Sequence, residues 1–160
     1  MHYPPGSAPT DPAAFSRFLK ILYFTLFGTV GLYWLVLEML AANVEPRESG
    51  MEKTLLAALA AACGVVVLYF RFSRIPPLLA EASGDFSQRL ARLRFHYILS
   101  YTLSEAVALY GFVVRMLGGA REEAAPFFLG AVALFLLCYP RVPPARGSPT
   151  GRFDSGGALR

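Results

Sequence analysis

Four long stretches without charged side chains, broken by a single carboxylate, constrain the fold of this 160-residue chain more than any other feature. They cover residues 21–37, 54–70, 97–114 and 124–140, and only the third contains a charged residue, Glu105. A helix needs roughly 20 apolar residues to cross the hydrocarbon core of a bilayer. Spanning β-strands would instead alternate apolar and polar residues over about ten positions. Because these stretches are continuously apolar, the sequence predicts four transmembrane helices.

The composition and the short loops extend this prediction to a fold class. Charged residues make up 16% of the chain, whereas soluble domains carry about a quarter. Short polar connections favour antiparallel neighbours, so we expect an all-α, polytopic membrane protein with four transmembrane helices in an antiparallel bundle. The expected transmembrane domain covers residues 15–142, between a disordered lead (1–14) and a disordered tail (143–160) rich in Pro, Gly and Ser. The expected helices cover about 18–42, 53–72, 86–118 and 124–141.

The basic residues predict the orientation in the membrane. Eleven lie before the first apolar stretch, between the second and third stretches, or after the fourth: Arg17, Lys20, Arg71, Arg74, Arg89, Arg92, Arg94, Arg141, Arg146, Arg152 and Arg160. Four lie on the other side: Arg47, Lys53, Arg115 and Arg121. By the positive-inside rule both termini are cytoplasmic and the protein belongs in the cell inner (plasma) membrane. The N-terminal stretch lacks a signal-peptide pattern, so the first helix is expected to be retained as an anchor.

Small residues indicate where helices can approach closely. The second stretch contains Ala57, Ala61 and Gly64, and the third contains Ser100 and Gly111. Close backbone approach drives helix association in lipid, so these two helices are expected to form the tightest pair. The expected third helix also extends before its apolar part as an amphipathic segment, in which Leu90, Leu93 and Tyr97 recur at helical spacing.

Glu105 is the candidate functional residue, because an ionisable side chain at mid-membrane is costly and is a functional candidate by default. Its carboxyl group either stays protonated or finds a partner inside the bundle. Tyr101, one turn earlier, can donate its hydroxyl to the carboxyl group or simply pack against it, and Ser104 and Ala108 complete the local surroundings. Two interpretations remain open: a functional ion-binding carboxylate, and a protonated group that hydrogen-bonds a neighbouring helix.

No motif indicates an enzyme or a cofactor site. The sequence has no HExxH or P-loop motif, no Ser-His-Asp set at useful spacing and only two histidines. Cys63 and Cys138 are far apart and belong to no metal-binding pattern. No cofactor, no metal and no nucleic-acid partner are therefore expected, and the expected partners are the lipid bilayer and a homo-oligomer or larger membrane complex.

The middle of the chain, about residues 54–114, resembles the proteolipid (subunit c) of rotary ATP synthases. The resemblance rests on "TLSEAVALYGFVV" in the third stretch, on the Ala-rich second stretch and on the connecting "RFSRIPP". The resemblance implies that Glu105 binds H⁺ or Na⁺ reversibly. The second stretch lacks the repeated GxGxGxG pattern of that family. We therefore expect a subunit or accessory component of a membrane assembly with a buried carboxyl group, the alternative being a proteolipid-like element that translocates protons or sodium ions.

Overall fold

The computed structural model describes residues 12–40, 50–80 and 86–141, and every regular element within these ranges is helical. Long helices are α1 (Pro12–Leu40), α2 (Gly50–Tyr69), α4 (Phe86–Met116) and α5 (Arg121–Leu137). A π-helical turn, η2 (Phe70–Arg74), and a short helix, α3 (Ile75–Ala80), extend α2. The all-helical prediction is therefore confirmed for the described residues, whereas the expected disordered lead and tail lie outside them, apart from residues 12–14, which begin α1.

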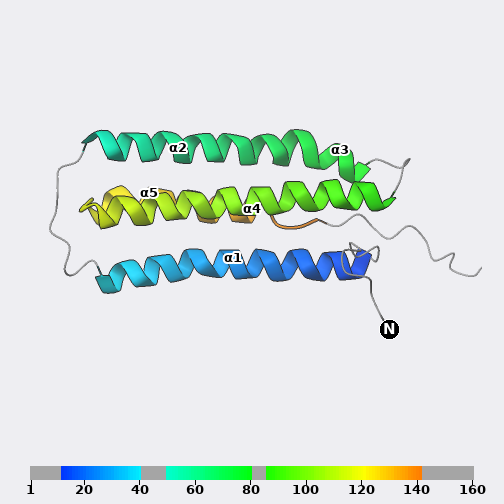
Figure 1. Cartoon of the computed structure of the whole chain (residues 1–160), viewed down its shortest axis with the longest axis horizontal. Coiled ribbons are helices and arrows are strands. Elements are labelled where there is room, and N and C mark those ends of the chain that lie inside the picture. Colours follow the sequence, from blue (N-terminus) through cyan, green and yellow to red (C-terminus); the bar gives the residue numbers. More distant parts are fainter. Residues whose placement is uncertain (1–11, 41–49, 81–85, 142–160) are drawn as a thin grey trace, which may run out of the picture.

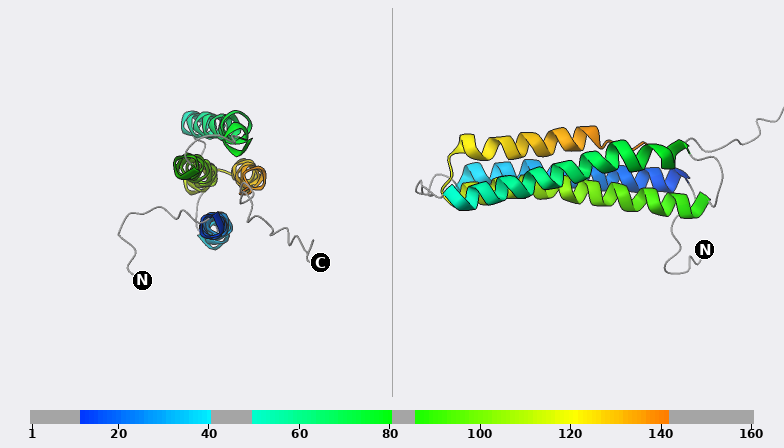
Figure 2. Two further views of the ribbon diagram at one scale, coloured as in Figure 1. Left: turned by 90° about the vertical axis from the view of Figure 1, so that its right-hand side faces the viewer. Right: turned by 90° about the horizontal axis from the view of Figure 1, so that it is seen from above.

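Helix α4 lies at the centre of the molecule. Figure 1 shows the long helices side by side, each running opposite to the next along the chain. Viewed end-on, α4 and α5 form the middle of the assembly, with α2 on one side and α1 on the other (Figure 2). The contacts agree, because α4 packs against α5, α1 and α2, and its most extensive contacts are with α5. Residues on different faces of α4 therefore contact different neighbouring helices.

Three helices are long and apolar enough to cross a membrane: Ala13–Leu40, Gly50–Ala80 and Ser87–Met116. The second of these counts α2, η2 and α3 as one continuous helix. Helix α5 has 17 residues, and at 1.5 Å per residue it is about 25 Å long. That length is below the thickness of a typical hydrocarbon core, about 30 Å. The first three predicted spans thus have the required length and composition, and the fourth remains a proposal.

The helix boundaries differ from the expected ones where prolines occur. The second helix continues past residue 72, because η2 widens to an i→i+5 turn in which Ile75 N–H bonds Phe70 O. Pro76 and Pro77 then fall in the first turn of α3, where a missing N–H is tolerated. Helix α5 begins at Arg121 rather than at residue 124, which places Pro126 inside the helix.

An aromatic cluster forms the core near the N-terminal half of α1. Tyr23 contacts Tyr101 and Phe135 edge-on, with ring centroids 5.6 and 5.8 Å apart. Tyr97 and Phe27 extend the cluster. The predicted amphipathic face at the start of α4 belongs to the same core, since Leu90, Leu93 and Tyr97 are all buried. Aromatic side chains from three helices thus hold α1, α4 and α5 in register.

Candidate functional site

The carboxyl group of Glu105 faces helix α1, where two hydroxyl groups reach it. Thr29 Oγ1 lies 2.9 Å from Glu105 Oε1, and Tyr33 Oη lies 3.1 Å from the same oxygen. The site is partly buried. Glu105 therefore lies at the interface of α1 and α4, in contact with neutral partners that are 76 and 72 positions away in the sequence.

Helical periodicity explains why these two hydroxyls act together. Thr29 and Tyr33 are four residues apart on α1, and residues at this spacing lie one above the other on the same helix face. Val30 and Leu37 flank them and are buried. Thr25, Thr29 and Tyr33 recur at this spacing in the sequence, and this recurrence is the signal that could have indicated a polar face on α1.

The site has more oxygen–oxygen contacts than hydroxyl protons. Besides Glu105, the Thr29 hydroxyl contacts the carbonyl oxygen of Leu26 at 2.6 Å. A hydroxyl has one proton and can donate fully to one acceptor at a time. Three oxygen–oxygen contacts therefore share the two hydroxyl protons of Thr29 and Tyr33. The single Thr29 proton is thus divided between Leu26 O and Glu105 Oε1.

The other candidates around Glu105 are not brought to its carboxyl group. Tyr101 is fully buried in the aromatic cluster, and its hydroxyl has no hydrogen-bond partner in the described part of the chain. The buried Ser104 hydroxyl donates to Ser100 O at 2.8 Å, one turn back in the same helix. Ala108 is fully buried and packs in the core. The structure therefore shows Tyr101 packed in the core, and its hydroxyl does not donate to Glu105.

The small residues predicted to join the second and third helices lie in different places. Gly111 meets α5 rather than α2, since a Cβ atom built on it would lie 2.7 Å from Phe127 Cβ. Ser100 is buried, and its hydroxyl donates to His96 O within α4. Ala57 and Ala61 are exposed, and nothing lies within 4 Å of a Cβ added to Gly64. Helices α2 and α4 do pack together, but the closest glycine contact of α4 is with α5.

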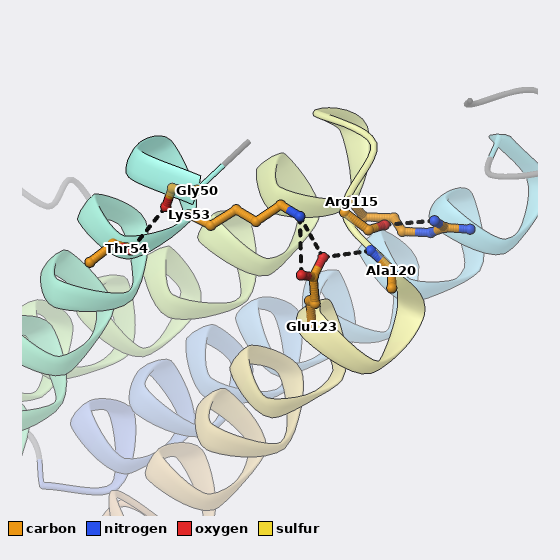
Figure 3. Close-up of polar contacts among 7 residues, drawn as sticks. Gly50, Lys53, Thr54, Arg115, Ala120 and Glu123 are labelled. Carbon is orange, nitrogen blue, oxygen red and sulfur yellow. Dashed lines mark hydrogen bonds and ion pairs between the residues drawn. The ribbon is translucent and has the colours of Figure 1, made fainter. Parts of the chain in front are cut away.

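Polar contacts close the end of the molecule where α2 and α5 begin and α4 ends (Figure 3). Lys53 Nζ contacts both carboxylate oxygens of Glu123, at 3.0 and 2.8 Å. Glu123 also accepts a hydrogen bond from Ala120 N–H at 2.7 Å, which satisfies a free donor at the start of α5. At the same end, Arg121 pairs with Glu38 at 3.2 Å, and Arg115 donates to Gly119 O.

The Lys53–Glu123 contact predicts a pH dependence of stability. The hydrogen bond from Lys53, followed by that from Ala120, lowers the pKa of Glu123 from its ordinary value of 4.5. A carboxyl pKa that is lower in the folded state gives stability that is present above the ordinary pKa and lost as pH falls through the folded value. Denaturation curves recorded between about pH 6 and about pH 3, a range that brackets the ordinary carboxyl pKa, should show this loss of stability.

The variant Glu123→Gln should flatten this pH dependence, because an amide does not titrate in that range. Lys53→Met should flatten it only in part, since Ala120 still donates to the carboxylate. If both variants lose stability on acidification as steeply as the wild type, the contact has no such role.

No group of three or more metal-ligating side chains occurs within residues 12–40, 50–80 and 86–141. Both cysteines are free thiols, Cys63 half-buried on α2 and Cys138 buried just after α5. The polar contacts of Glu105 with Thr29 and Tyr33 are therefore the arrangement on which a functional proposal is built. In comparisons with known proteins, no family model, no curated protein and no solved structure matches this chain.

Proposed function

We propose that this chain is a small multi-pass membrane protein, a subunit or accessory component of a membrane assembly, in which a protonated Glu105 ties α4 to α1. The observation that carries the proposal is the shortage of protons at the site. Three oxygen contacts share two hydroxyl protons, so a proton on Glu105 completes the set. Thr29 then donates to Leu26 O, Tyr33 donates to Glu105, and Glu105 donates to Thr29.

The energetics of the bilayer favour the neutral form. A charged side chain at the centre of a spanning helix costs about 2.5–3.5 kcal/mol on insertion scales. The partners of Glu105 are two hydroxyl groups, and neither is a cation. A neutral carboxyl group that both donates and accepts a hydrogen bond avoids this cost and links the two helices.

The proposed topology includes α5 as a fourth span and places both termini in the cytoplasm. Helix α5 packs against α4 more extensively than any other pair of helices does, and its buried face includes Phe128, Ala131 and Phe135. The excess of basic residues in the N-terminal turns of α1, in η2, in the N-terminal part of α4 and after α5 supports the orientation.

A role in an assembly is supported by the unfilled surface between α2 and α5. A hollow of about 540 Å³ opens there, and its lining includes the small residues Ala57, Ala60, Gly64, Gly130 and Ala133. Small residues allow a further helix to approach closely in lipid. This surface is where we place the contact with another subunit.

The alternative function, translocation of protons or sodium ions, is favoured by one observation. Glu105 is only half-buried, so that a carboxyl group at the edge of the α1–α4 interface is open to exchange with its surroundings. In this alternative Glu105 releases and rebinds its ion, and Thr29 and Tyr33 are the neutral ligands that remain.

The two functions are separated by substitutions at Glu105. Glu105→Gln keeps one donor and one acceptor group, so the free energy of unfolding should stay within about 0.5 kcal/mol of the wild-type value. Glu105→Leu should cost about 1–2 kcal/mol, because a hydrogen bond between membrane helices contributes about 0.6 and at most 1.7 kcal/mol. Unfolding in mixed detergent micelles measures the difference. Thr29→Val should show part of the loss. Thr25→Val, one turn earlier on α1 and exposed, is the matched control and should show none.

Two further measurements address the proton itself. Infrared spectra should contain the carbonyl stretching band of a protonated carboxylic acid at neutral pH, and Glu105→Gln should remove it. Absence of this band from the wild type contradicts the proposed tie. Carbodiimide labelling of Glu105 that is blocked by Na⁺ favours ion translocation, whereas an inert Glu105 with a fully tolerated Glu105→Gln removes that alternative.

A further inference from the structure

One end of the molecule carries many cations and, among the described residues, no carboxylates. This basic end comprises the N-terminal turns of α1, η2 with α3, the N-terminal part of α4 and the residues after α5, which lie together at the right of Figure 1. Its described basic residues are Arg17, Lys20, Arg71, Arg74, Arg89, Arg92, Arg94 and Arg141. The sequence segments that adjoin these elements outside the described ranges contain three further arginines and four acidic residues, Asp11, Glu81, Asp85 and Asp154. A strong positive excess remains over the whole sequence.

At the opposite end, ion pairs neutralise two cations. There, Lys53 pairs with Glu123 at 2.8 Å and Arg121 pairs with Glu38 at 3.2 Å. At the basic end, Arg71 Nε instead donates to Leu137 O at 2.6 Å. A carbonyl oxygen holds a guanidinium group in place without cancelling its charge, so the positive charge of Arg71 is still available to an external anion.

Aromatic rings hold two further arginines at the same end. Arg94 lies over the Phe18 ring at 4.3 Å, and Arg74 lies over the Tyr69 ring at 5.6 Å. Tyr69 is 49% exposed. An exposed tyrosine beside a cation is typical of the boundary between hydrocarbon and headgroups, which supports headgroup depth for these cations.

We propose that the basic end binds the headgroups of anionic phospholipids in the leaflet that it meets. The anion that the described residues do not supply is then the lipid phosphate, and the exposed Arg17, Lys20, Arg74 and Arg92 are the side chains that contact it. The proposal rests on the membrane-spanning arrangement of the proposed function, but it does not depend on the proton held by Glu105.

The test reconstitutes the full-length protein in lipid nanodiscs that contain phosphatidylcholine alone or mixed with phosphatidylglycerol. Both faces of a disc have the same lipids, so the outcome does not depend on orientation. Native mass spectrometry of the released protein then counts the retained lipids. We expect phosphatidylglycerol to be preferred by at least about fivefold, which is the gain that a single cation near an anionic membrane surface provides. High salt should reduce the preference.

Charge-neutralising variants locate the preference. The quadruple variant Arg17→Gln, Lys20→Gln, Arg74→Gln and Arg92→Gln should abolish it, and Arg92→Gln alone should weaken it. Arg121→Gln is the matched control, because it removes an exposed arginine from the opposite end, and it should leave the preference unchanged.

Each remaining outcome counts against the proposal. Equal retention of the two lipids by the wild type overturns it, and an equal loss in Arg121→Gln also overturns it. The infrared band of Glu105, recorded on the same discs, keeps the two proposals separate. If the band is present and the lipid preference is absent, the lipid site alone is wrong.

Discussion

Replacing Gly111 by alanine is expected to destabilise the protein by about 1–3 kcal/mol, which is the usual cost of overpacking a well-packed interior. A Cβ atom at this position would lie 2.7 Å from Phe127 Cβ and 3.1 Å from both Ala124 O and Phe128 Cε2. Two of these atoms are fixed by the α5 backbone and cannot rotate away, so α4 and α5 must separate to admit a methyl group. Unfolding in mixed micelles measures this loss.

The matched control is Gly64→Ala on α2. Nothing lies within 4 Å of a Cβ atom added there, and alanine is favoured over glycine inside a helix by up to about 1 kcal/mol. Gly64→Ala should therefore be neutral or slightly stabilising in the same assay. Equal stability of the Gly111→Ala variant and the wild type would mean that α4 and α5 do not approach each other as described.

The variant Tyr101→Phe is expected to stabilise the protein, by about 1 kcal/mol and by 3 kcal/mol at most. The Tyr101 side chain is fully buried, and its hydroxyl has no hydrogen-bond partner in the described residues. A buried polar group without a partner costs about 1–3 kcal/mol. Phenylalanine keeps the ring contacts with Tyr23 and Phe135 while removing the unpaired hydroxyl.

Tyr97→Phe is the control with the opposite expected sign. The Tyr97 hydroxyl donates to Arg141 O at 3.2 Å and accepts from Arg141 N–H at 3.0 Å. Its removal should cost about 1 kcal/mol, the net contribution of a typical hydrogen bond. Both midpoints come from the same micelle titration. A lower midpoint for Tyr101→Phe than for the wild type would show that its hydroxyl has a partner after all.

The position of Glu105 shows where prediction from the sequence stops. Its uncharged surroundings identified it as the residue to examine, and the predicted third helix does contain it. Its partners Thr29 and Tyr33 belong to α1, whereas the sequence pointed to Tyr101 within the same helix. Local spacing relates residues along one helix, but it contains no information about which other helix faces the carboxyl group.

Gly111 illustrates the same limit for packing. The sequence marked it as a small residue suited to close approach, and the structure places that approach against Phe127 of α5. In a soluble bundle the apolar stripe of each helix would have indicated the inner face. Lipid is as apolar as these side chains, so helices that are apolar on all sides give little indication of which faces meet.

The sequence predicted some features of the helices, and the tertiary structure decided others. Long apolar runs by themselves predicted a helical chain with four spans, because backbone groups in lipid must be bonded within their own segment. Three of the helices have the length and composition to cross a membrane. Only the tertiary structure decided that the second helix continues through a π turn to Ala80, and that α4 is the central helix shared by α1, α2 and α5. These features depend on contacts between distant segments, and side-chain packing selects them.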